Sequence, residues 1–148
     1  MTLSALRARA LSLLDRVAWA GPLLARLVIG SVFVTAGWGK LHNLPKVVEY
    51  FTELGIPAPQ LQAPFVAAVE FGCGLAVLLG FLTRLAAIPL IGTMVVALLT
   101  ALRPQVGSFD DLTGIAEFLY IVILVQVITH GAGALSIDRL LAKPAAGR

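Results

Sequence analysis

The stretch RLVIGSVFVTAGWGKLHN, residues 26–43, places a cation near each end of an almost uninterrupted apolar run. On a helix, its residues Arg26, Gly30, Phe33, Gly37 and Lys40 follow one another at steps of four or three and therefore share one face. The two cations lie about 21 Å apart along such a helix, roughly two-thirds of the hydrocarbon thickness of a bilayer. The stretch is therefore best interpreted as a membrane-spanning helix with one polar stripe.

The composition of the whole chain supports a membrane protein. Of its 148 residues, 59% are hydrophobic and 13% charged, with a mean hydropathy of +0.94. Soluble domains are about half apolar and about a quarter charged. The net charge of +3 does not indicate nucleic acid, because the cations flank apolar segments and no basic patch contains interleaved aromatic residues. The single cysteine, Cys73, excludes an internal disulfide and a CxxC thiol relay.

Four apolar stretches have lengths suited to crossing a bilayer, which needs about 20 residues. They cover residues 22–41, 61–82, 85–102 and 112–129. We therefore predict an all-α fold, an integral membrane four-helix bundle. The predicted units are an amphipathic interfacial helix at 1–21, a four-span domain at 22–141 and a flexible tail at 142–148. The tail ALSIDRLLAKPAAGR, residues 134–148, is expected to be peripheral, and the 42–60 connection is expected to hold a short helix.

The distribution of cations predicts the orientation in the membrane. With four spans both termini share one side, which would hold eight of the eleven Lys and Arg residues. The termini are therefore expected in the cytoplasm of a bacterium, with the chain in the inner (plasma) membrane. An alternative is a secretory signal cleaved after Ala36. The long, itself amphipathic N-terminal region disfavours it.

The second apolar stretch repeats the stripe of the first. Glu70, Gly74, Val77, Phe81 and Arg84 have the same spacing of four, three, four and three. Antiparallel neighbours would bring Lys40 and Glu70 to one level in the outer half of the membrane if Arg26 and Arg84 mark the inner boundary. Glu117, about 20 Å along its helix from His130, is expected at that level too, with Tyr120 one turn away.

Ionisable side chains at one depth in hydrocarbon are costly unless they pair. Lys40 could serve both Glu70 and Glu117, leaving the cluster with one negative charge or a shared proton. These residues and Tyr120 are candidates for ligand binding or proton exchange with a quinone or a hydroxylated aromatic. Gly30, Gly37 and Gly74 are expected to let helices approach closely. Arg26 and Arg84 are candidates for structure or orientation.

Three interpretations of this cluster remain open from the residues alone. It can fix helix pairing and register, it can bind a redox ligand, or it can line a transport path. Transport is disfavoured, because the chain holds no inverted repeat of broken helices. No metal site is expected, because His42 has no second ligand nearby and His130 suits an interfacial anchor better than a ligand. No flavin, haem or cluster motif is present.

Several segments together resemble the DoxX family of small bacterial membrane proteins. They are RLVIGSVFVTAGWGKL, GIPAPQ, EFGCGLAVLLGFLTRLAA and GAGALSIDRLL, within roughly residues 22–141. The resemblance implies a four-helix membrane protein linked to redox metabolism, either as a subunit related to those of thiosulfate:quinone oxidoreductases or as a companion of quinone or catechol detoxification. Arg26, Lys40, Glu70 and Arg84 match its motif positions, whereas Glu117 rests on the depth argument. The resemblance carries over no catalytic residue.

The leading functional hypothesis is a redox-associated membrane subunit or accessory protein that engages a quinone-like or small aromatic ligand. Electrons would come from a partner or a soluble cofactor, because the sequence has no motif for a bound one. The alternative is a non-enzymatic scaffold whose charged cluster is structural and which recruits soluble redox partners. Whether the chain is itself an enzyme, a quinone-linked oxidoreductase subunit, stays open. The expected surroundings are the lipid bilayer; a homo-oligomer remains open, and nucleic acid is not expected.

Overall fold

The computed structural model describes residues 3–142, and every regular element in that range is helical. The prediction of an all-α chain is thereby confirmed for this part. The α-helices are α1 (Leu3–Val17), α2 (Ala20–His42), α3 (Leu44–Glu53), α4 (Pro59–Leu79), α5 (Thr83–Leu99), α6 (Phe109–Gly114), α7 (Ala116–His130) and α8 (Ile137–Leu141). A 3₁₀ turn, η1 (Arg103–Gln105), lies between α5 and α6.

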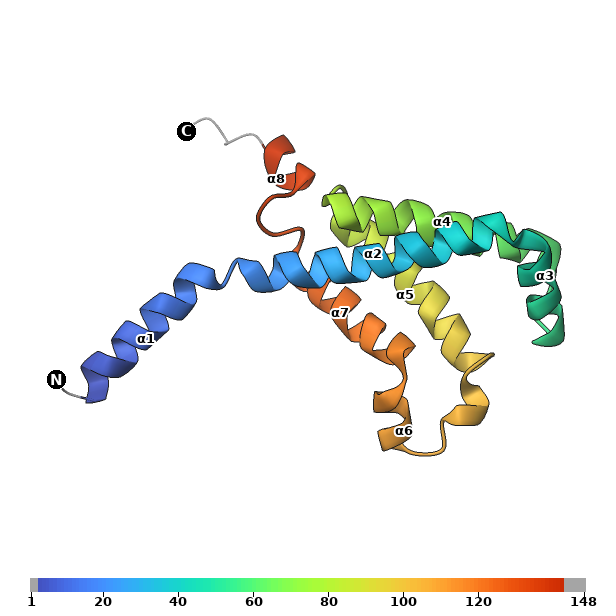
Figure 1. The fold of residues 1–148 in the computed structure, drawn as a ribbon, viewed down its shortest axis with the longest axis horizontal. Coiled ribbons are helices and arrows are strands. Elements are labelled where there is room, and N and C mark those ends of the chain that lie inside the picture. The colour runs from blue at the N-terminus through green and yellow to red at the C-terminus, as the bar shows by residue number, and fades with distance from the viewer. Residues whose placement is uncertain (1–2, 143–148) are drawn as a thin grey trace.

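Two pairs of helices make the body of the molecule (Figure 1). α2 runs alongside α4, and α5 packs against α7 at a steep angle to the first pair, with α4 and α5 joined by a tight turn. α3 crosses the far end of α2 and α4, whereas α1 extends away from the bundle. One end of the molecule, next to the start of α2, therefore holds the turn between α4 and α5 and the segment after α7. The other end holds the longer connections, which run from α2 to α4 and from α5 to α7.

The core lies where the four long helices meet. Ile29 and Phe33 of α2 pack with Val77 of α4, Leu90 of α5 and Leu124 of α7, and all five are almost completely buried. Many other large apolar side chains face outward, which is the expected exterior for a protein surrounded by lipid. Such residues include Leu24, Leu61, Phe65, Leu85, Leu99 and Leu119.

Two helical stretches are long and apolar enough to cross a membrane. The first is Leu11–His42, with 32 residues, which runs from the second half of α1 to the end of α2. The second is Pro59–Leu79, with 21 residues, which is α4. α5 and α7 are apolar but shorter, with 17 and 15 residues. The four-span topology and the cytoplasmic termini stay predictions.

The fourth apolar stretch is not one helix, as residues 112–129 were expected to be. The backbone of Ile115 is extended (φ −85°, ψ 128°) and separates α6 from α7. α6 begins earlier, at Phe109, because the Ser108 hydroxyl accepts the amide of Asp111 and so caps its first turn. Apolar periodicity continues across the break, which explains why the sequence alone did not reveal it.

The described start of the tail predicted to be peripheral, residues 134–142, instead packs against the other helices. Ser136 is buried, and the Asp138 amide donates to the Gly80 carbonyl at 2.8 Å. α1 provides the helix expected within residues 1–21, although residues 1–2 lie outside the described range. Of the predicted tail at 142–148, everything after Ala142 lies outside that range as well.

Candidate functional site

The site is built on a close crossing between α2 and α4. A Cβ on Gly30 would lie 2.8 Å from the Cα of Leu78, and a Cβ on Gly37 would lie 2.7 Å from the Cα of Phe71. A Cβ on Gly74 would lie 2.9 Å from an α2 backbone nitrogen. Real side chains do not tolerate such distances, so these three glycines allow the two backbones to approach closely.

Lys40 and Glu70 meet next to this crossing. Lys40 stands in the last turn of α2, one turn after Gly37, and Glu70 directly precedes Phe71 in α4. The Lys40 ammonium donates to Glu70 Oε2 in an ion pair. The Glu70 side chain is only 2% exposed, whereas that of Lys40 is 31% exposed. Burial without this cation would be strongly unfavourable for the Glu70 carboxylate, so the pair fixes both side chains.

A cavity of about 490 Å³ opens beside the ion pair and is also lined by Glu117. Glu117 lies in the first turn of α7, immediately after the break at Ile115. It accepts no hydrogen bond and forms no ion pair with any residue that the structure describes. The cavity thus brings together three of the four predicted ligand-binding candidates: Lys40, Glu70 and Glu117.

The rest of the cavity wall is mostly apolar. α3 contributes two aromatic side chains, α4 contributes the face that leads to Glu70, and α5 contributes one face between Pro89 and Ala97. Its apolar and aromatic lining includes Tyr50, Phe51, Leu54, Ile56, Phe65, Val66, Val69 and Met94. An apolar cleft with a few polar groups is the usual form of a site for a small organic molecule.

Tyr120, the fourth candidate, is not among the residues that line this cavity. Its ring packs against the buried core and makes an edge-to-face contact with Phe33, with ring centroids 6.2 Å apart. The spacing that places Tyr120 one turn after Glu117 is correct. The cavity, however, lies beside the start of α7, so the next turn faces the core instead.

Sequence reasoning missed two parts of the wall. Tyr50 and Phe51 come from α3, which was predicted as a short helix without a role in the site. Gly92 and Thr93 come from α5, whose uniform hydropathy gives no sign of which face is lined by a cavity. The apolar face of α3, with Val47, Val48, Phe51 and Leu54, was the one signal in the sequence for its contact with the bundle.

The opposite end of the bundle carries the two arginines predicted to mark the inner boundary. Arg26 is buried, with 2% exposure, and donates to the Ala132 carbonyl at 2.7 Å and the Leu135 carbonyl at 2.9 Å. Its Nε has no hydrogen-bond partner in the described structure. Arg26 therefore holds the segment after α7 against α2, a more specific contact than the boundary position predicted for it.

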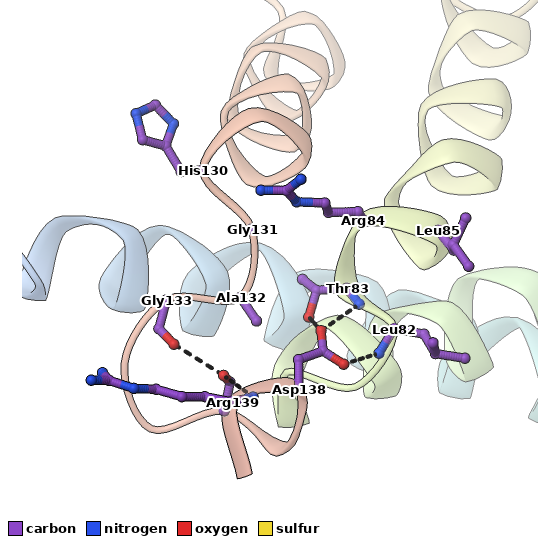
Figure 2. Close-up of a pocket in the computed structure, with 11 residues that line it drawn as sticks. Leu82, Thr83, Arg84, Leu85, His130, Gly131, Ala132, Gly133, Asp138 and Arg139 are labelled. Atoms are coloured by element: carbon purple, nitrogen blue, oxygen red, sulfur yellow. Dashed lines mark hydrogen bonds between the residues drawn. The ribbon is translucent and has the colours of Figure 1, made fainter. Parts of the chain in front are cut away.

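Arg84 lies at the edge of a second cavity at this end, of about 430 Å³. Figure 2 shows its guanidinium directed toward the Gly131 backbone, below His130, whereas Arg139 points away from it. The Arg84 Nη2 contacts the Thr129 carbonyl only at 3.4 Å, and the residue is exposed. The arginine side chains in Figure 2 thus do not converge on one point.

Asp138 organises this end of the molecule and was also missed. Its carboxylate accepts the amides of Leu82 at 2.7 Å and Thr83 at 3.1 Å, and the Thr83 hydroxyl at 3.0 Å (Figure 2). It thereby caps α5, which Leu82 enters with a φ of +45°. Burial raises the pKa of Asp138, but these hydrogen bonds and the nearby Arg26 charge outweigh burial and hold the pKa below its ordinary value.

Comparison with known proteins places the chain among small membrane proteins. Residues 21–103 match the DoxX family. "Inner membrane protein YqjF" of Escherichia coli strain K12 is 40% identical over 83% of this chain and 93% of its own length. "Uncharacterized membrane protein Rv3486" of Mycobacterium tuberculosis is 35% identical over 81% of this chain and 80% of its own.

A more distant relative carries a name that refers to an activity. "Putative oxidoreductase CatD" of Bacillus subtilis is 29% identical over 83% of this chain and 88% of its own length. No solved structure matches the chain significantly.

Proposed function

This chain belongs to the DoxX family of membrane proteins, and from that premise we propose that it binds a quinone-like or small aromatic ligand in the cavity beside Lys40, Glu70 and Glu117. It would act as a redox-associated protein of the inner membrane, as a subunit or an accessory protein. The name of the CatD relative supports an association with oxidoreductases, and the names of YqjF and others support the membrane.

One observation carries the proposal: a mainly apolar cavity of about 490 Å³ contains an ion pair and a carboxylate without a partner in the described chain. A cluster that served only to join helices would be expected to pair all its charges. Glu117 departs from that expectation. Glu117 lines a space that could hold one substituted aromatic ring.

The chemistry available in the cavity is hydrogen bonding and proton exchange. Lys40 can donate to a ligand oxygen, while Glu70 and Glu117 can accept or return protons when a quinone-like ligand changes its redox state. The electrons would come from a soluble partner enzyme, because the sequence has no motif for a bound flavin, haem or iron–sulfur cluster. In the predicted four-span topology the termini are cytoplasmic and the cavity lies toward the outer half of the membrane.

The proposal is tested by filling the cavity without touching its charges. Gly92 lines the cavity, and a Cβ added there would meet nothing within 4 Å, so Gly92→Leu should place its side chain in ligand space with no clash at Cβ. Gly72 is the matched control, because a Cβ there also meets nothing within 4 Å and the residue does not line the cavity. Both changes replace a helical glycine, so their effects on helix stability should be alike.

The measurement is equilibrium binding of a decyl-substituted benzoquinone to the full chain in lipid nanodiscs. Saturable binding by the wild type and by Gly72→Leu, with at least about tenfold weaker binding by Gly92→Leu, is the expected result. Equal binding by all three proteins would place the ligand elsewhere. The absence of saturable binding to the wild type would remove the proposed function.

A scaffold that recruits soluble partners is the second candidate function. The observation in its favour is α1, which extends from the bundle and exposes Leu6, Leu11, Leu13 and Leu14 together with Arg7. A scaffold needs no ligand in the cavity. Loss of partner recruitment on deletion of α1, in a protein that binds no quinone, is the pattern that would favour this function.

A further inference from the structure

Several polar groups in the cavity wall are already hydrogen-bonded within the protein. The Thr93 hydroxyl donates to the Leu90 carbonyl at 2.8 Å, and the Thr100 hydroxyl donates to the Val96 carbonyl at 2.7 Å. The Gln62 amide is likewise engaged, with the Pro57 carbonyl at 3.0 Å. These three side chains line the cavity; both threonine hydroxyl hydrogens and one of the two Gln62 amide hydrogens are already used within their own segments.

Three of the four carboxylate oxygens, by contrast, accept no hydrogen bond from the described chain. Lys40 donates to Glu70 Oε2, which leaves Glu70 Oε1 with no hydrogen bond in the described chain. Neither carboxylate oxygen of Glu117 has a partner there. The ionised cavity therefore carries one cation and two carboxylates, a net charge of −1. A bound molecule meets carboxylate oxygens that require donors.

The remaining wall favours a flat, neutral ring. Phe51 and Phe65 present aromatic surface, and the Tyr50 side chain, which is 48% exposed, adds a hydroxyl with no hydrogen bond in the described part of the chain. Lys40 retains hydrogens beyond the one given to Glu70. A ligand oxygen that only accepts can therefore still be held, but it lies near carboxylates that repel it, whereas a hydroxyl can donate to them.

We propose that the cavity selects the reduced, hydroxyl-bearing form of its aromatic ligand, a quinol, over the oxidised quinone. This inference rests on the proposed function, whose ligand class it makes more specific. A quinol brings two O–H donors to the free oxygens of Glu70 and Glu117. A quinone brings only acceptors, and its oxygens would face those carboxylates.

The preference has a measurable size. One hydrogen bond to a charged group favours the quinol by about tenfold or more. By linkage, a tenfold preference raises the midpoint potential of the bound two-electron couple by about 30 mV relative to the free couple. The ratio of quinol to quinone affinity and the shift in midpoint potential must agree. The preference can therefore be measured in two independent ways.

The experiment uses the full chain in lipid nanodiscs and three probes: a decyl-substituted benzoquinone, its quinol under anaerobic conditions, and the dimethyl ether of that quinol. The ether keeps the ring, tail and oxygens but has no donor. The expected order is quinol tightest, with quinone and ether each at least about tenfold weaker. Equal affinity for quinol and ether would overturn the inference while leaving the proposed function in place.

Other outcomes distinguish a failure of ligand binding from a failure of the quinol preference. If none of the probes binds saturably, the proposed function itself fails. If an aromatic ammonium ion of the same size displaces the quinol at lower concentration than unlabelled quinol does, the cavity is a cation site and the inference is overturned.

A pair of variants identifies the carboxylate responsible. Glu117→Gln removes the charge of a side chain that has no partner in the described chain, so folding should be unaffected while the quinol preference falls toward equality. Glu53→Gln is the matched control, because Glu53 is exposed on α3 and does not line the cavity. An unchanged preference in Glu117→Gln would contradict the role assigned to this carboxylate.

Discussion

Replacing Gly37 by alanine tests how the close helix crossing supports the site. The added Cβ would lie 2.7 Å from the Cα of Phe71, whereas ordinary contact begins at 3.4 Å. Because the Phe71 amide nitrogen would lie closer still, α2 and α4 must separate locally by at least about 0.7 Å, enough to lose roughly a quarter to a half of the dispersion attraction of the contacts involved. Because the neighbouring atoms are backbone, no side-chain rotation can relieve the clash.

The expected net effect follows from two opposing contributions. Overpacking of this kind costs about 1–3 kcal/mol. Alanine regains about 1 kcal/mol over glycine inside a helix. Gly37→Ala should thus lower the free energy of unfolding by about 1 kcal/mol. It should also weaken quinone binding, because Lys40 follows Gly37 by one turn and Glu70 adjoins Phe71.

The assay is unfolding by SDS titration from mixed micelles, followed by tryptophan fluorescence. Trp38 is a local reporter, since its ring centroid lies 5.6 Å from that of Phe71. Gly39→Ala is the control, because a Cβ there meets nothing within 4 Å, and it should be neutral or stabilising by up to about 1 kcal/mol. If Gly37→Ala proves as stable as Gly39→Ala, the backbones of α2 and α4 do not approach each other closely at Gly37.

Three further changes probe the ion pair and the opposite end of the bundle. Lys40→Met should destabilise the protein by about 3 kcal/mol in the same titration, and adding Glu70→Leu should restore most of it, because an apolar pair replaces an unpaired buried carboxylate. Arg26→Met should lower the free energy of unfolding by about 2–3 kcal/mol, because two carbonyls lose charged donors. A smaller loss than that caused by Arg139→Met, at an exposed arginine, would refute this. Asp138→Asn should remove an α5 cap worth about 1 kcal/mol. The pKa of Asp138 is lowered from 3.8 in the folded protein, so its carboxylate stabilises the fold above that pH. This stabilisation is lost as the pH falls through the lower folded pKa, and the melting temperatures of the wild type and Asp138→Asn should therefore converge in acid. A constant difference between them at every pH would contradict this.

The sequence predicted the part of the site that depends on helical periodicity. Lys40 and Glu70 belong to stripes with equal spacing on two antiparallel helices, and such stripes place their ends at equal depth. The glycines in those stripes mark where α2 and α4 approach each other. Periodicity of this kind depends only on rise and rotation per residue, so it could be determined without any knowledge of tertiary structure.

The missed features depend on backbone breaks and on contacts distant in sequence. The extended backbone at Ile115 interrupts an apolar run that gives no sign of a break, and it decides that Glu117, but not Tyr120, faces the cavity. Asp138 reaches the start of α5 across more than fifty residues of sequence. Its role could not be derived from spacing.

The most direct test of the account is to map where a quinone binds in the folded chain. A photoreactive azidoquinone with a decyl tail is crosslinked to the protein in nanodiscs, and the labelled peptides are identified by mass spectrometry. The account predicts labels on the cavity faces of α3, α4 and α5, around Phe51, Phe65 and Met94, that disappear when excess unlabelled quinol is present. Labels spread over the lipid-facing surface, or labels that excess quinol does not reduce, would contradict it.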